Sequence, residues 1–197
     1  MAANIRGILL AAGYSKRFGS NKLLQALPAG SPQAGTPIAL ASARHFLDAL
    51  PDSVAVVRPR AQKLARILRD AGCNTVLCKN AGEGMGTSLA AGVRATSDAD
   101  GWIVALADMP FIRPETIRIV AKALRDGAAI AAPSFRGERG HPVGFARRFL
   151  EELSSLRGDD GARQLLKQHP ESLTLHEVDD PGVVRDIDKP SDLEAQA

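Results

Sequence analysis

The sequence is poor in aromatic residues and has no strong excess of charge of either sign. Aromatic side chains make up 4% of its 197 residues, so small aliphatic residues supply most of the core, which suits helices packed on a sheet. Lys and Arg exceed Asp and Glu by 25 − 22 = 3, too few to indicate a nucleic-acid partner. No apolar run approaches the roughly 18 residues that a membrane span needs, so no membrane partner is expected.

Patterns of cysteine, serine and glycine exclude several classes of protein. Four residues separate Cys73 from Cys78, which matches no zinc or redox spacing, so both are expected to be reduced and structural. Ser15 and Ser88 lack the flanking glycines of a nucleophile elbow, which argues against acyl transfer. No dinucleotide fingerprint is present, which disfavours a Rossmann-type oxidoreductase. Because the first eight residues include no apolar stretch of signal-peptide length, we expect a cytoplasmic protein.

Hydrophobic patterning predicts strands that alternate with helices. Strands are expected at residues 5–12, 53–57, 75–78, 102–107, 128–132 and 173–178, and helices at 38–50, 61–71, 87–96, 114–124, 146–156 and 162–169. This alternation is typical of a doubly wound α/β fold, with one mainly parallel sheet and helices on both faces. We expect residues 1–197 to form a single domain. The stretch 135–145 interrupts the pattern and is interpreted as an irregular functional loop.

The loop after the first strand carries a candidate phosphate site. It reads L-A-A-G-Y-S-K-R-F-G-S-N-K over residues 10–22, and glycines at both ends allow backbone N–H groups to converge on an anion. Arg17 and Lys22 are placed to add positive charge. The spacing is not that of a Walker A loop, and a tight turn with two solvated cations is an equal alternative.

Carboxylates from two other parts of the chain, residue 108 and residues 186–188, form a candidate metal site. Asp108 follows an apolar strand, where a hard oxygen ligand suits Mg²⁺; the alternative is a helix N-cap. In a short strand, alternation would place Asp186 and Asp188 on one face and Ile187 on the other, so that one acid completes the metal site. The alternative there is a solvated turn.

A second group of polar residues lies in the sequence R-G-H-P-V-G-F at residues 139–145. Arg139 and His141 together are suited to hold a phosphate or a polar heterocycle. A histidine beside a proline is as often a structural hydrogen-bonding residue, so this assignment stays open.

Six ordered motifs carry a resemblance that covers most of the chain. They are residues 10–22, E-G-M-G-T-S-L at 83–89, A-L-A-D-M-P at 105–110, R-G-H-P-V-G-F at 139–145, G-D-D-G-A-R at 158–163 and D-I-D at 186–188. Together they resemble the nucleotidyltransferases of molybdenum cofactor biosynthesis. Three of these motifs are most similar to the branch that transfers CMP from CTP to molybdopterin. They are the A-A-G form of the first motif, R-G-H-P-V-G-F at 139–145 and G-D-D-G-A-R at 158–163.

The resemblance implies a Rossmann-like nucleotidyltransferase fold in which Mg²⁺ and a nucleoside triphosphate lie over the first loop. The terminal phosphate of molybdopterin would attack the α-phosphorus and expel pyrophosphate. The nucleotide-binding residues it implies are Leu10, Ala11, Ala12, Gly13, Ser15, Arg17, Lys22, Gly84 and Ser88. The implied catalytic residues are Arg17, Lys22 and Asp108, the metal ligands Asp108 and Asp188, and the acceptor-binding residues Arg139, His141, Asp160 and Arg163.

Other functions remain open from the sequence. A related enzyme would use GTP or another phosphorylated acceptor. A non-catalytic carrier would retain a nucleotide or cofactor and pass it to a molybdenum enzyme or its chaperone. The presence of Arg17, Lys22 and Asp108 favours chemistry, because a carrier has no need of a metal site. A phosphate nucleophile is already ionised at neutral pH, so the absence of a catalytic triad fits transfer to a phosphate.

Overall fold

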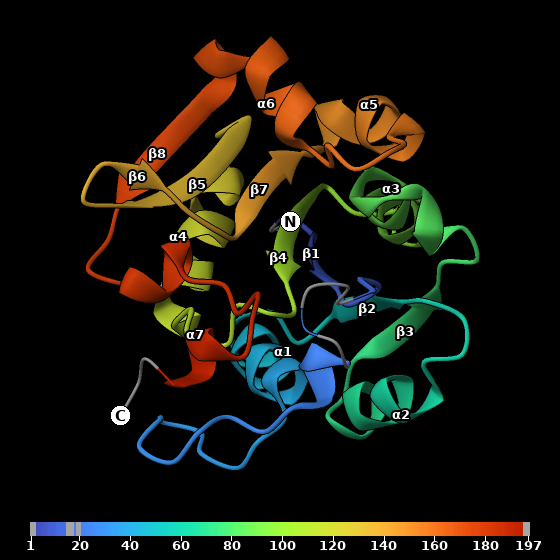
Figure 1. Ribbon diagram of the computed structural model, residues 1–197. Helices are drawn as coiled ribbons and strands as arrows, with labels where there is room; N and C mark the ends of the chain where they lie inside the picture. The colour runs from blue at the N-terminus through green and yellow to red at the C-terminus, as the bar shows by residue number, and fades with distance from the viewer. Residues whose placement is uncertain (1–2, 15–17, 19–20, 195–197) are drawn as a thin grey trace.

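The computed structural model describes residues 3–14, 18 and 21–194. In this part of the chain, eight strands form one mixed sheet between two layers of helices (Figure 1). The strands are β1 (Ile5–Leu10), β2 (Ser53–Val57), β3 (Asn74–Leu77), β4 (Gly101–Leu106), β5 (Ile130–Phe135), β6 (Glu138–Arg139), β7 (Val143–Ala146) and β8 (Leu173–Glu177). The helices are α1 (Ile38–Ala49), α2 (Gln62–Asp70), α3 (Met85–Ala95), α4 (Pro114–Arg125), α5 (Leu150–Ser155), α6 (Arg163–Gln168) and α7 (Ser191–Glu194). In the described part of the chain, no helix is long and apolar enough to cross a lipid bilayer.

The strand order places β1 and β4 at the centre of the sheet. The order is β3-β2-β1-β4-β7-β5-β6, and β8 pairs with β5. Strands β3, β2, β1 and β4 are mutually parallel, and Leu9 of β1 pairs with Ala55 and Ala105 on either side. The carboxyl ends of these four strands therefore meet at one edge, where ligands bind in such sheets.

Alternation along the central strands divides the core into two layers. Leu9 and Ile103 pack with α1, α2 and α4 on one face of the sheet, whereas Ile8 and Trp102 pack with α3, α5 and α6 on the other. Neighbouring side chains of a strand point to opposite faces, so both faces need a cover of helices. The predicted doubly wound, mainly parallel sheet with helices on both faces is confirmed.

The interpretation of residues 135–145 as an irregular loop is wrong. Strand β7 lies inside the sheet and runs antiparallel to both β4 and β5. Val143 and Phe145 are buried on it, and a Cβ on Gly144 would lie 3.0 Å from side chains of Ile103 and Val120. The glycine that made this stretch look like a loop allows helix α4 to pack closely on the strand.

The C-terminal segment, residues 178–190, also differs from the expectation. Residues 186–188 form no strand, and the preceding residues form a short 3₁₀ helix, Pro181–Val184. Ile187 is fully buried, and its N–H donates to the carbonyl of Asp108 at 3.0 Å. This backbone bond, rather than a sheet, places residues 186–188 beside the end of β4.

Candidate active site

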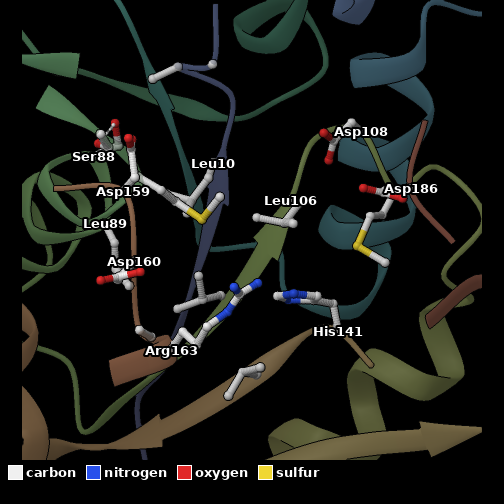
Figure 2. A pocket seen from close by; sticks show the side chains of 18 of the residues that line it. Leu10, Ser88, Leu89, Leu106, Asp108, His141, Asp159, Asp160, Arg163 and Asp186 are labelled. Atoms are coloured by element: carbon white, nitrogen blue, oxygen red, sulfur yellow. Dashed lines mark hydrogen bonds between the residues drawn. The ribbon is translucent and has the colours of Figure 1, made fainter. Parts of the chain in front are cut away.

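A cavity of about 880 Å³ opens at the carboxyl ends of β1 and β4. Asp108 and Asp186 lie on one side of it, and Ser88, Asp159 and Asp160 lie on the other (Figure 2). Between them the side chains of Arg163 and His141 point toward each other in this view. The cavity therefore joins chain segments that are far apart in the sequence.

Lys22 bridges the two carboxylates that the sequence assigned to a metal site. Its Nζ lies 2.7 Å from Oδ2 of Asp108 and 3.0 Å from Oδ1 of Asp188. The Lys22 side chain is only 11% exposed, because it enters from a 3₁₀ turn, Lys22–Leu24, at the rim of the cavity. The structure thus brings Asp108 and Asp188 into contact with one ammonium group.

The electrostatics of this group follow from crowding of charge. Burial alone would lower the pKa of Lys22, but the carboxylates of Asp108 and Asp188 outweigh it and raise that pKa above its ordinary value. The pKa of Asp186 is raised by burial and then by its carboxylate neighbours Asp188 and Asp108. This side of the cavity thus holds three acids and one lysine, an arrangement that favours additional cations.

Two further aspartates hold the C-terminal segment in place. Asp192 Oδ2 accepts hydrogen bonds from the N–H groups of Asp188 at 2.8 Å and Lys189 at 2.9 Å. Asp180 is 2% exposed. Its carboxylate accepts from the Thr116 hydroxyl at 2.7 Å and from the N–H groups of Arg113 at 2.9 Å and Gly182 at 3.0 Å. The carboxylate thus ties the segment to the start of α4.

The opposite wall is built by close contact between two backbones. Gly84 has φ +120°, and a Cβ there would overlap the backbone of Gly158. The N–H of Gly86 donates to the carbonyl of Gly158 at 2.8 Å. These contacts hold the loop that carries Asp159 and Asp160 against the start of α3. Residue 84 must be glycine for two reasons: its positive φ disfavours other residues, and the Gly158 backbone leaves no space for a Cβ.

Arg139, His141 and Arg163 supply the polar groups of the third wall. The N–H of His141, which lies between β6 and β7, donates to the carbonyl of Val183 at 2.8 Å and so joins this part of the sheet to the C-terminal segment. Burial, followed by the charge of Arg139, lowers the pKa of His141 to about 4, so this imidazole is neutral at physiological pH. Burial and the neighbouring Arg163 lower the pKa of Arg139.

Most residues selected from the sequence line this one cavity. They are Leu10, Ala12, Gly13, Lys22, Gly84, Ser88, Asp108, Arg139, His141, Asp160, Arg163 and Asp188. Ala11 is buried and is not among the lining residues, and its N–H donates to the carbonyl of Val56 at 2.9 Å, so this N–H already has a partner in the sheet. Ser15 and Arg17 lie outside the described residues.

Sequence reasoning did not identify Tyr14 or Asp180, and it included Asp159 only as part of the motif at residues 158–163. Tyr14 lines the cavity, and the guanidinium of Arg58 lies 4.6 Å from the centre of its ring. The motif around residues 158–163 gave a signal for Asp159. Asp180 had none, because its partner Thr116 is 64 residues away.

The donor set at Asp108 fits a hard divalent cation. Oδ1 of Asp108 is buried without a hydrogen-bond partner among the described residues, so its lone pairs are not taken by a protein donor there. Carboxylate oxygens are the ligands that Mg²⁺ and Mn²⁺ prefer. Within residues 3–14, 18 and 21–194, no three His, Cys, Asp or Glu side chains form a ready-made metal centre.

The fold and the site together define a class, the α/β transferases that bind a nucleotide at the carboxyl edge of a parallel sheet. The chain belongs to the family of MobA-like NTP transferase domains, whose family model matches residues 7–173. The predicted membership of a MobA-like nucleotidyltransferase family is confirmed. Asp186 and Asp188 lie beyond the matched residues.

Known relatives agree with this membership over nearly the whole chain. Purine catabolism protein PucB of Bacillus subtilis (strain 168) is 30% identical, over 95% of this chain and 93% of PucB. The crystal structure of Rv0371c from Mycobacterium tuberculosis H37Rv has a TM-score of 0.82 at 26% identity, covering 100% of this chain and 98% of Rv0371c. A manganese complex of Rv0371c has a TM-score of 0.76 at 23% identity, covering 98% and 97%. Molybdopterin-guanine dinucleotide biosynthesis protein A from Archaeoglobus fulgidus shares the fold, with a TM-score of 0.62 at 18% identity over 97% and 96%.

Proposed function

We propose that this nucleotidyltransferase transfers CMP from CTP to the terminal phosphate of molybdopterin and releases pyrophosphate. One observation carries the proposal: Lys22, Asp108 and Asp188 form a cluster of ion pairs in the same cavity as Arg139 and Arg163. The first set suits a triphosphate and its metal, and the second suits an anionic acceptor. The resemblance of the A-A-G motif to cytidylyltransferases favours CTP over GTP.

On the nucleotide side, the chain supplies alignment and positive charge. Gly13, Gly84 and Ser88 line the part of the cavity where base and ribose are proposed to bind. Lys22, together with Arg17, is proposed to neutralise the phosphates. In-line displacement builds negative charge on the α-phosphate and on the leaving pyrophosphate, so cations directed there stabilise the transition state by several kcal/mol in a site that excludes water.

Asp108 and Asp188 are the proposed ligands of Mg²⁺. When bound, the metal supplies charge neutralisation and polarises the phosphoryl oxygens. Rv0371c, which shares the fold of this chain, has been solved in complex with manganese, and this supports the proposal that a divalent cation binds here. The carboxylates themselves perform no proton transfer in this proposal.

On the acceptor side, Arg139 and Arg163 are proposed to hold the phosphate of molybdopterin, and Asp160 to contact the pterin. His141 is neutral at physiological pH because its pKa is lowered to about 4, so its role is hydrogen bonding rather than charge neutralisation. A phosphate monoester is already ionised, so the reaction needs no general base. We propose that the chain works in the cytoplasm and delivers its product to a molybdenum enzyme or its chaperone.

A screen for pyrophosphate release tests this function. ATP, GTP, CTP and UTP are each incubated with molybdopterin, with and without Mg²⁺. We expect turnover with CTP that requires Mg²⁺, and none with Asp108→Asn, whose thermal transition stays close to that of the wild type. Equal turnover with all four nucleotides would refute the cytidylyl assignment, and wild-type turnover by Asp108→Asn would refute the metal-ligand role.

A further inference from the structure

Lys22 occupies a position that a divalent cation would need. Its ammonium group contacts one carboxylate oxygen from each of Asp108 and Asp188, at 2.7 Å and 3.0 Å. The three side chains are 11%, 21% and 30% exposed, so water screens these contacts only in part. The two acids come from the end of β4 and from the C-terminal segment, and Lys22 contacts both of them.

Two cations cannot use these oxygens in the same way at the same time. A divalent ion that coordinates Asp108 and Asp188 takes lone pairs that now accept hydrogen bonds from Lys22. It would also stand beside a positive charge in a partly buried site, where repulsion is strong. Binding of the metal to these two oxygens, Oδ2 of Asp108 and Oδ1 of Asp188, therefore requires the ammonium group to leave.

We infer that Lys22 is an internal substitute for the divalent cation. Its ammonium group holds Asp108 and Asp188 together and must be displaced before a metal ion can bind the two oxygens that it contacts. This inference rests on the proposed function for the identity of the metal site. The triphosphate offers the displaced ammonium group a new anionic partner. Metal and nucleotide therefore favour each other's binding, and the nucleotide-free chain binds metal weakly.

Binding of Mn²⁺ alone, without nucleotide, tests the inference. The free ion is counted by its electron paramagnetic resonance signal during titration of the intact chain. Lys22→Met removes the competing charge, and Lys22→Gln also removes it but keeps a hydrogen-bond donor. Both variants are expected to bind Mn²⁺ at least about tenfold more tightly than the wild type, within the range usual for coupling between two ligands. The control is Lys63→Met on the exposed face of α2, which removes the same charge far from these acids.

Addition of Asp108→Asn to Lys22→Met locates the tighter binding. We expect the double variant to lose the gain, because one of the two carboxylates is gone. The inference is overturned if both folded Lys22 variants bind Mn²⁺ no more tightly than Lys63→Met. It is also overturned if the gain survives Asp108→Asn.

A measurement on the wild type covers the case in which the Lys22 variants do not fold. Titration with diamagnetic Mg²⁺ should shift the Lys22 ammonium resonance in NMR spectra together with the carboxyl carbon signals of Asp108 and Asp188. Carboxyl shifts at saturation with an unchanged ammonium signal would overturn the inference. None of these tests uses molybdopterin or CTP. Tighter Mn²⁺ binding by Lys22→Met would stand even if pyrophosphate release failed, and the reverse result would leave the proposed function intact.

Discussion

Replacement of Asp180 by alanine tests how the C-terminal segment is held. The Asp180 carboxylate is 2% exposed and accepts three hydrogen bonds. Two of its donors, the hydroxyl of Thr116 and the N–H of Arg113, lie at the start of α4, and the third is the N–H of Gly182. Alanine cannot accept any of them, so all three donors lose their partner at once.

The magnitude follows from the number of donors left without a partner. A buried donor without an acceptor costs about 1–3 kcal/mol, and one of the three is only partly buried. We expect Asp180→Ala to lower the free energy of unfolding by about 3–5 kcal/mol. For a chain of this size, each kcal/mol corresponds to roughly 2–4 °C in Tm, so the midpoint should fall by about 10 °C.

Thermal unfolding followed by circular dichroism measures this loss, and Asp179→Ala is the matched control. The Asp179 side chain is exposed, and only its backbone carbonyl is used, by Arg113. Asp180→Asn keeps one acceptor oxygen, so its Tm should lie between those of Asp180→Ala and Asp179→Ala. Because Asp180 acts through the segment that carries Asp188, Asp180→Ala should also raise the Mg²⁺ concentration needed for half-maximal activity. Equal Tm values for Asp180→Ala and Asp179→Ala would refute this account.

Three further outcomes can be measured separately. Lys22→Ala should raise the KM for the triphosphate more than Arg139→Ala does, and the reverse order in steady-state kinetics would exchange the two proposed sides of the cavity. The pKa of His141 is about 4 in the folded chain against an ordinary value of 6.5, so acidification from pH 6.5 to pH 4 protonates mainly the unfolded chain and destabilises the fold. Urea titrations of His141→Gln should show a smaller loss of unfolding free energy between these pH values. An identical loss in the wild type and the variant would contradict the lowered pKa. Burial raises the pKa of the Cys73 thiol to about 11, so at pH 8 an aromatic disulfide reagent should react with this thiol only after unfolding, and rapid labelling of the folded chain would contradict its burial.

The strands that the sequence predicts well are those whose apolar runs are continuous. Strands β1, β2 and β4 are central and parallel, so helices cover both of their faces, and every position except Arg6 of β1 is apolar or small. Strand β7 escaped prediction because Gly144 and the polar residues before it are typical of loops. Its place in the sheet depends on the fit of that glycine under α4, which no local pattern encodes.

The candidate site was predictable to the extent that its residues follow strands. Asp108 comes after β4, and the parallel topology alone brings it to the ligand-binding edge. The position of Asp188 depends instead on long-range bonds, such as that from the Ile187 N–H to the Asp108 carbonyl. The contact of Lys22 with both acids was not foreseen either, because a lysine in a phosphate motif is expected to face the ligand.

The only tryptophan in the sequence, Trp102, is fully buried on β4 and donates from Nε1 to the Thr96 hydroxyl at 3.0 Å. The only tyrosine, Tyr14, lines the cavity and is 48% exposed. The chain thus carries two intrinsic fluorophores in separate surroundings. Emission from the indole follows loss of the folded core, whereas emission from the phenol follows events at the ligand, so one sample can distinguish denaturation from occupancy without an attached dye.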